Sequence, residues 1–595
     1  MFKFKLSYVA LAAALSSSYV CADPATYNLS SGTKVIDIEA PNAAGVSHNQ
    51  YNQFNVDSNG LILNNSASDF THSTLGDIGK NNNLTGDSAT VILNEVISKN
   101  RSTLNGFIEV GGQKADVVIA NPNGITCSGC SFVNTNQAIL TTGKVNMAET
   151  GAIENYAVSS GIINIEKGGL NAPDSYALLL ADVINLTGKV NANSAQLSAG
   201  NFTLDNTTGI VTSAGKGTSI FNKLSPTYSI DISSLGGVTA NSITMVGNNL
   251  GFGVRNKGAI VANYGLSMSS NGELINEGAI TNNGFLTQMA SAGEMKNTGT
   301  ISNGSLAMIT SYNNLSNTGT ISGAGQMAVS AAGNIVNKGT IKAGEQLLVS
   351  TNGNLENTGA AYIQSGDQLA ISALGDITQN YGLMEGKNTA ITFGGDNMKV
   401  TGYIFGTETL LIQSAKDKKL SSGNITNGGR IYGGDIYVQT KGTLAQAADS
   451  QMIADNSLVA VSSLLSNTGF LGGLGADVMV QNLQTDNYGH IDGGSVNVVT
   501  AGNIYNEGMI RSGSDLVLNT QNQGNIVNRG HIIAKDTMTL TAKQIENGGY
   551  GCGLFKLAKC GVGNIVADTL KLNTANGANI GGTQSYKKAE INIVK

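Results

Sequence analysis

The chain of 595 residues is poor in several residue types. It contains no tryptophan, and aromatic residues make up only 5% of it. Charged residues make up 12%, about half the share found in an average soluble domain. Disorder combines low hydrophobicity with high net charge, whereas here 41% of residues are hydrophobic and the formal net charge is −6. These deficits argue against a disordered chain and favour a repetitive fold rich in β-structure.

Basic residues are scarce and scattered. The sequence has 34 Lys and Arg against 40 Asp and Glu, without a basic stripe that could neutralise a phosphate backbone. We therefore expect no nucleic-acid partner.

The N-terminus has the pattern of a secretory signal. Two lysines precede an apolar run over about residues 6–15, and small residues then lead to Ala22, a suitable cleavage position. A membrane anchor is one alternative, but the run is shorter than the roughly 20 apolar residues of a spanning helix. A lipoprotein modified at Cys21 is another, although the residues before it make a poor lipobox. We predict that residues 1–22 are a cleaved signal peptide.

A short pattern, Asn-x-Gly-x-Ile, recurs with a period near twenty residues. The first five copies start 20 or 21 residues apart, and weaker or more widely spaced copies follow almost to the end of the chain. The copies start at Asn256, Asn276, Asn297, Asn317, Asn337, Asn357, Asn427, Asn467, Asn487, Asn506 and Asn528.

Each period predicts two or three short strands. Apolar alternations of three to five residues are separated by Gly and Asn, and no apolar stripe has helical spacing. We predict an all-β fold, a right-handed parallel β-helix (solenoid) with coils of about 20 residues. Coils stacked about 4.8 Å apart would bury aligned Ile, Val and Leu, and the asparagines would form ladders of amides at the corners. Flexible low complexity is the alternative, which the strict period disfavours.

Proline marks a boundary. All five prolines precede residue 227, and a strand paired on both edges needs every N–H. We predict a signal peptide (1–22), an N-terminal module (23–250), a repeat array (251–547) and a C-terminal tail or cap (548–595). The array, of roughly fifteen periods, would form a rod about 70 Å long.

Four cysteines remain after signal cleavage, in two close pairs. Cys127 lies near Cys130, and Cys552 lies near Cys560. An oxidising compartment favours two local disulfides. A four-thiolate zinc site is the alternative, but a solenoid would hold the pairs apart by most of its length. We therefore predict no metal site and no cofactor.

Residues from about 31 to 145 carry an ordered set of motifs. They include the block from Val46 to Val56, the element Asn81-Asn82-Asn83-Leu84, and the run from Ala120 to Cys130 that contains Asn-Pro-Asn-Gly-Ile and Cys-x-x-Cys. Together they resemble the secretion domain of two-partner-secretion exoproteins, the filamentous haemagglutinin and haemolysin family. Position 82 departs mildly, since family members often have Ser or Pro there.

The resemblance implies an export route and roles for the motif residues. The chain would pass through the periplasm, be recognised by a partner outer-membrane β-barrel transporter, and reach the cell surface or the extracellular space. A purely structural role in tight turns is the alternative, and the two roles are compatible. A role in transporter recognition or folding would fall to Asn81, Asn83, Leu84, Asn121, Pro122, Asn123, Gly124 and Ile125.

No catalytic constellation stands out. Of the four histidines, His48 lies inside a motif block, and His490 and His531 stand at variable positions of the repeat. We expect a non-enzymatic adhesin or haemagglutinin that binds an unidentified host or bacterial surface receptor. The alternative is a shortened contact-dependent inhibition toxin carrier, or a haemolysin, with the same export module. A carrier would continue into a toxin domain after a Val-Glu-Asn-Asn junction, which this sequence lacks.

Overall fold

The computed structural model describes residues 23–72, 74–213, 228–417, 419–552, 558–560 and 563–593. Every regular secondary-structure element assigned in these residues is a β-strand. Within these ranges, no helix is long and apolar enough to cross a membrane. The predicted signal peptide (1–22) lies outside the described residues, as do the side chains of Cys552 and Cys560.

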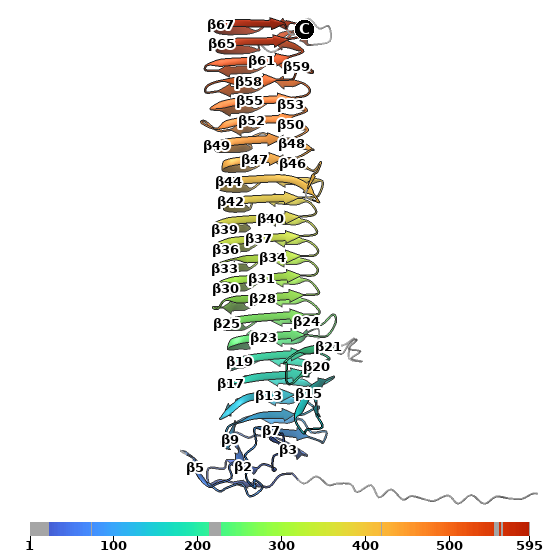
Figure 1. Cartoon of the computed structure of the whole chain (residues 1–595), viewed down its shortest axis with the longest axis vertical. Helices are drawn as coiled ribbons and strands as arrows, with labels where there is room; N and C mark the ends of the chain where they lie inside the picture. The colour runs from blue at the N-terminus through green and yellow to red at the C-terminus, as the bar shows by residue number, and fades with distance from the viewer. Residues whose placement is uncertain are drawn as a thin grey trace, which may run out of the picture.

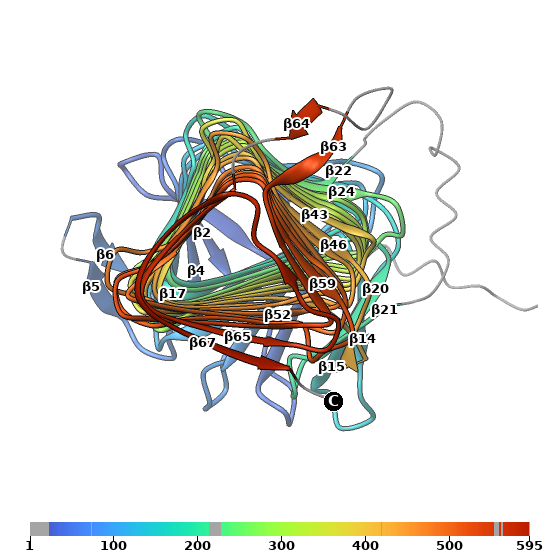
Figure 2. The ribbon, with the colours of Figure 1, turned by 90° about the horizontal axis from the view of Figure 1, so that it is seen from above.

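The chain winds into a parallel β-solenoid of about 23 turns, with coils of about 21 residues. The strands stack into a long rod (Figure 1), which is triangular when seen along its axis (Figure 2). In Figure 1 the front strands run from left to right while the chain rises from the N-terminus to the C-terminus. The solenoid is therefore right-handed, and the predicted parallel β-helix is confirmed.

One coil illustrates the repeat. It consists of β29 (Met295–Asn297), β30 (Thr300–Asn303) and β31 (Leu306–Ser311), one strand for each face of the triangle. Each pairs in parallel with its counterpart in the next coil, β32 (Leu315–Asn317), β33 (Thr320–Gly323) and β34 (Met327–Ala331). Because this register is kept, inward side chains of equivalent positions stack, as Ile301, Ile321 and Ile341 do.

The interior is one continuous hydrophobic cluster. It extends from Ile36 near the N-terminus to Leu572 near the C-terminus. A single coil cannot bury its apolar side, so each coil is stabilised mainly by its two neighbours. The solenoid thus continues through residue 250 without a break in the core.

The asparagines of the repeat form a ladder inside the corner. The Nδ2 of Asn256 donates to the Oδ1 of Asn276 at 2.9 Å, and equivalent bonds of 2.7 to 2.8 Å continue from coil to coil up to Gln379. A second run of 2.6 to 2.7 Å extends from Asn467 to Asn547. The Oδ1 of Asn256 also accepts the N–H of Gly258, at 3.1 Å. The predicted amide ladder is present, in two sections.

An additional sheet covers the outer side of the first coils. It contains β14 (Lys144–Met147), β15 (Ile153–Val158), β20 (Phe202–Asp205) and β21 (Val211–Ser213), all paired antiparallel. Its Tyr156 and Phe202 are buried against outward residues of the solenoid, among them Leu180. These first coils are therefore apolar on both sides of the solenoid wall.

Two shorter elements complete the N-terminal end. The strand β1 (Thr26–Asn28) pairs antiparallel with β2 (Lys34–Asp37) in the first coil. The hairpin of β5 (Phe70–His72) and β6 (Gly76–Ile78) covers a small cluster that includes Ile62. The N-terminal end is thus built differently from the regular rod.

Candidate functional site

The first asparagine of the Asn81-Asn82-Asn83-Leu84 motif points into the protein. Asn81 is 1% exposed, and its Nδ2 donates to the carbonyls of Ile38 and Asn64 at 2.8 and 2.9 Å. Its Oδ1 accepts the N–H of Asn83 at 2.8 Å. Leu84 closes the turn by donating its N–H to the carbonyl of Asn81, and its side chain joins the core. The motif is a tight turn fixed to the first coil.

The Asn121-Pro122-Asn123-Gly124-Ile125 motif forms the same kind of turn. Asn121 is fully buried, and its Nδ2 donates to Asn100 O and Ser102 Oγ, both at 2.9 Å. Its Oδ1 accepts the N–H of Asn123 at 3.0 Å, and the N–H of Gly124 donates to its carbonyl at 3.0 Å. The two motifs, 40 residues apart in the sequence, therefore repeat one local geometry.

The backbone conformation at position 124 requires glycine. Its φ is +110°, a conformation that residues with a Cβ rarely adopt. A Cβ at this position would lie 2.9 Å from the carbonyl oxygen of Ile162. Ile125 begins β11 (Ile125–Cys127) and is fully buried in the core. Gly124 and Ile125 thus connect the turn to the next strand of the solenoid.

The turns expose their second residues. Asn82 and Pro122 are exposed, while Asn83 and Asn123 are partly buried. The Nδ2 of Asn83 donates to Ile38 O at 3.1 Å, and that of Asn123 to Ser98 O at 2.8 Å. The buried amides therefore hold Asn82 and Pro122 at the surface in defined positions.

A disulfide follows directly after the second turn. Cys127 and Cys130 are bonded, with their Cα atoms 5.5 Å apart, and both are buried. The bond joins the end of β11 to the start of β12 (Cys130–Val133). Residues 121–130 therefore form one cross-linked corner. The pairing predicted for Cys552 and Cys560 lies outside the described side chains.

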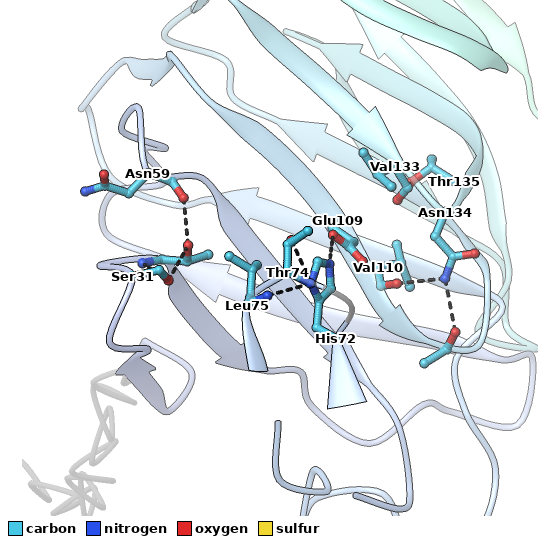
Figure 3. Close-up of polar contacts among 12 residues, drawn as sticks. Ser31, Asn59, His72, Thr74, Leu75, Glu109, Val110, Val133, Asn134 and Thr135 are labelled. Carbon is cyan, nitrogen blue, oxygen red and sulfur yellow. Dashed lines mark hydrogen bonds and ion pairs between the residues drawn. The ribbon is translucent and has the colours of Figure 1, made fainter. Parts of the chain in front are cut away.

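Two histidines pair with carboxylates in the same region. His72 lies 3.0 Å from Glu109 through Nε2, and its Nδ1 accepts the N–H groups of Thr74 and Leu75, both at 3.1 Å (Figure 3). This ties the β5–β6 hairpin to β9 (Phe107–Gly112). His48 lies 2.8 Å from Glu95, and this hydrogen bond lowers the pKa of Glu95 although burial opposes it.

Sequence reasoning missed two asparagines of this module whose side chains donate to backbone carbonyls, the buried Asn65 and the partly buried Asn134. Asn65 is fully buried, donates to the carbonyls of Ala89 and Gln113, and accepts the N–H of Ala89 at 2.7 Å. Asn134 has a left-handed backbone and donates to the carbonyls of Val110 and Gly112 (Figure 3). The available signal was a polar pair at the end of an apolar strand, where Asn64 and Asn65 follow Leu61–Leu63.

The region around the two motifs is built from tight turns and packed side chains. Among the described residues, no group of three or more His, Cys, Asp or Glu side chains is placed to hold a metal ion. His490 and His531 are exposed and lie two coils apart on one face of the rod. The two motifs at the N-terminal end form turns that each expose one residue, Asn82 or Pro122.

Comparison with known proteins agrees with the motifs. The family model described as the TPS secretion domain matches residues 16–282. The chain is 43% identical over 246 residues to the tRNA nuclease CdiA of Yersinia mollaretii, covering 41% of this chain and 8% of that protein. It is 38% identical over 248 residues to the 16S rRNA endonuclease CdiA of Enterobacter cloacae, covering 41% of this chain and 7% of that protein. The chain thus spans less than a tenth of the length of these relatives.

A solved structure is similar to the same region. It is the crystal structure of a filamentous hemagglutinin secretion domain, with 31% sequence identity and a TM-score of 0.40. The match covers 47% of this chain and 92% of that one. The family model over residues 16–282 and the sequence identity to the CdiA proteins show that the chain is a two-partner-secretion exoprotein, secreted through the outer membrane to the cell surface of Gram-negative bacteria.

Proposed function

We propose that this protein is a surface-exposed adhesin that a partner outer-membrane β-barrel transporter exports. The observation that carries the proposal is the combination, in one chain, of a secretion domain and a long solenoid with an exposed aromatic groove, to which Tyr362, Tyr381 and Tyr403 contribute. The secretion domain would engage the transporter, and the solenoid would present the groove to a surface receptor. The described solenoid would have a binding role and no catalytic one.

The two exposed turns support the transporter contact. Asn82 and Pro122 lie at the surface, each held by a buried amide one residue earlier in the chain. A rigid, exposed turn is recognised at little cost in conformational entropy. We therefore assign recognition to the exposed residues, and the shaping of the turns to Asn81 and Asn121.

The folding route is consistent with export. Contacts in a solenoid are local, so folding can begin in the secretion domain as it emerges and continue coil by coil. The sheet and hairpin that cover the first coils would provide the starting structure. Export of an extended chain would then be coupled to folding outside the cell.

The aromatic groove is the candidate receptor site. It has a volume of about 350 Å³ and is lined by Ala360, Ala361, Tyr362, Tyr381, Gly382, Leu383, Tyr403 and Phe405. Tyr362 and Tyr381 are 42% and 75% exposed. Tyrosines combine a large apolar ring with a hydroxyl and are frequent anchors in binding sites. The uncharged lining favours a neutral ligand.

The groove lies where the repeat changes. From Asn337 the chain reaches the next paired residue at Thr340, but from Asn357 the equivalent residue is Tyr362, two positions further on. In the following coil Tyr381 adopts a left-handed backbone with φ of 58°. Tyr362, Leu383 and Tyr403 follow Thr340 in one outward column, and the two altered corners add Ala360, Ala361 and Tyr381 beside it.

The export part of the proposal is tested by expressing the chain with and without a two-partner transporter. Transporter-dependent appearance of protease-resistant protein at the surface is expected, and Pro122→Ala should reduce it while leaving the purified protein folded. A matched control is Pro173→Ala, outside the motif. Surface delivery without any transporter would contradict the proposal.

The adhesin part is tested separately, with purified protein on host and bacterial cells. Tyr362→Ser combined with Tyr403→Ser should abolish binding, whereas Tyr312→Ser, at a 69% exposed tyrosine outside the groove lining, should not. Equal binding by both variants would remove the groove from the adhesin hypothesis.

A second candidate is a carrier for contact-dependent inhibition, or a haemolysin. The observation in its favour is that the relatives similar over the N-terminal region include a protein named toxin CdiA from Yersinia pestis, 38% identical over 256 residues. Growth competition between cells that express the chain and cells that lack it would distinguish the candidates, since an adhesin alone leaves growth unchanged.

A further inference from the structure

One outward-facing column of side chains is apolar in nine successive coils. Parallel register places each member directly over the one before, from Met308 to Met479. We call this column the apolar stripe. It consists of Met308, Ala328, Leu348, Ala370, Ala390, Leu411, Tyr437, Val459 and Met479.

The stripe is turned to solvent. Met308, Leu348, Tyr437 and Met479 are 39 to 43% exposed, whereas their inward neighbours Ile309 and Val349 are fully buried. The outer face of a solvated sheet normally carries polar residues, and contiguous apolar patches on monomers are usually interaction sites. Because its apolar side chains are contiguous, the stripe is a better candidate for an interaction surface than the isolated exposed apolar side chains elsewhere.

The strands that carry the stripe lie one above another along the middle and upper parts of the rod in Figure 1. They make a flat face because their register is continuous. In addition to β31 and β34 they are β37 (Gln346–Thr351), β40 (Gln368–Ala373), β42 (Leu383–Phe393), β44 (Tyr403–Lys416), β47 (Arg430–Gln439), β49 (Gln451–Val461) and β52 (Asp477–Asn482).

The columns on either side are nearly uncharged. The column two residues after the stripe holds Thr310, Ser330, Ser350, Ser372, Thr392, Gln413, Gln439, Val461 and Gln481. The column two residues before it, from Gln346 to Asp477, holds Gln, Asn, Thr, Ser and two carboxylates. Asp435 and Asp477 each accept a serine hydroxyl from the next coil, at 2.6 Å. The described part of these three columns has no Lys or Arg.

The face is large enough for a specific interface. Nine strands about 4.8 Å apart span about 38 Å, and three columns along the strands are about 13 Å wide. This gives roughly 500 Å² on each of two facing rods, or about 1,000 Å² in total, near the lower limit for a specific protein interface. Flat sheets can pack face to face with interdigitating side chains.

We propose that the apolar stripe is the contact surface between two copies of this chain, which pair side by side along their rods. A neutral face meets a copy of itself without repulsion, and a two-fold pair uses the same patch on both partners. A strongly charged partner would find no complementary charge in these columns. The modest area and the cost of association predict a reversible dimer.

Sedimentation velocity of the full secreted chain tests the proposal. The wild type should change from monomer to dimer over about 1 to 100 μM. Leu348→Lys combined with Leu411→Lys should raise the dissociation constant more than about tenfold, because the interface would bury two lysines from each partner beside only two carboxylates, Asp435 and Asp477. Added sodium sulfate should strengthen the wild-type dimer, since apolar contacts increase in such salts while ion pairs weaken.

The matched control is Ser322→Lys combined with Gln364→Lys. These residues stand one coil below and one coil above Lys342, in an outward column of another face. The control adds the same charge outside the stripe and should dimerise like the wild type. If the first variant fails to fold by circular dichroism, Ala370→Gln combined with Ala390→Gln replaces it.

Two results would overturn the proposal. One is a wild-type monomer at every concentration, and the other is equal dimerisation of the stripe variant and its control. A monomer that co-floats with zwitterionic phosphatidylcholine vesicles through the stripe would assign this face to lipid instead.

Discussion

In the amide column of the solenoid, Val400 pairs directly with Gln379, and the ladder of hydrogen-bonded side chains ends between these two residues. Above Val400 the column continues with Asn427, whose Nδ2 donates to the carbonyl of Gln451. A valine side chain can neither donate nor accept, so the polar ladder is interrupted where the aromatic groove lies. The parallel strand pairing continues across the interruption, where Val400 packs in the core.

Restoring the ladder should stabilise the rod locally. Val400→Asn would place an amide between Gln379 and Asn427, in a corner that otherwise follows the Asn-x-Gly-x-Ile pattern. A net hydrogen bond is worth about 1 kcal/mol. We expect slower proteolysis and hydrogen exchange in the neighbouring coils. A loss of stability would mean that the surrounding apolar packing outweighs the added hydrogen bonds.

Breaking the ladder at another position should lower the stability of the rod by more than Val400→Asn raises it. Asn317 is fully buried, accepts from Asn297 and donates to Asn337, both at 2.8 Å. Asn317→Leu would remove both ladder bonds and the donation from Asn317 Nδ2 to the carbonyl of Thr340, each a net loss of about 1 kcal/mol. Thermal unfolding followed by circular dichroism should show a clear decrease. The exposed change Thr318→Leu, at the next residue, is the control and should have a small effect.

The regular coils could be predicted from the sequence, whereas features that depart from the 20-residue period could not. The ladder and the stacked Ile301, Ile321 and Ile341 follow from one period, because each coil meets only its neighbours. The apolar stripe is not visible as a repeat, because Leu411 and Tyr437 are 26 positions apart while Met308 and Ala328 are 20 apart. Only the strand register brings these residues into one column.

The covering sheet of the secretion domain was also beyond prediction. The run Leu178-Leu179-Leu180 indicates a strand that is buried on both faces. Leu179 faces the solenoid core, and Leu178 and Leu180 face the covering sheet. A strand that is apolar at every position is buried on both faces, but the sequence does not say which element covers it. Likewise, the motifs of Asn81 and Asn121 were recognisable, whereas the inward direction of both amides was not.

Gly124→Ala should damage the secretion domain. The left-handed backbone disfavours a Cβ, and that atom would lie 2.9 Å from Ile162 O and 3.0 Å from Arg101 Nη2. Strain of this kind costs about 1 to 3 kcal/mol. We expect lower yield at the cell surface and faster proteolysis of the purified secretion domain. Gly209→Ala is informative as a control, since its φ is also positive but no atom lies within 4 Å of the added Cβ.

Loss of the disulfide should loosen the first coils without unfolding the rod. A cross-link over so short a loop contributes about 2 kcal/mol in the chain-entropy description, and it joins only β11 to β12. Replacing both Cys127 and Cys130 by serine should therefore increase proteolysis near residues 121–133 while the repeat array stays resistant. Mass spectrometry of the fragments separates this result from global unfolding.

Acid stability should depend on Glu95. The hydrogen bond from His48 lowers the pKa of Glu95 in the folded protein, so ionised Glu95 stabilises the fold at pH values above its unfolded pKa of about 4.3. That contribution is lost as the pH falls through the lower, folded pKa, because the unfolded state binds the proton first. Glu95→Gln should therefore flatten the decrease in urea midpoint between about pH 5 and pH 3. Glu149→Gln, at an exposed turn, should leave the acid profile unchanged, and an unchanged profile in Glu95→Gln as well would rule out the His48–Glu95 pair as a contributor.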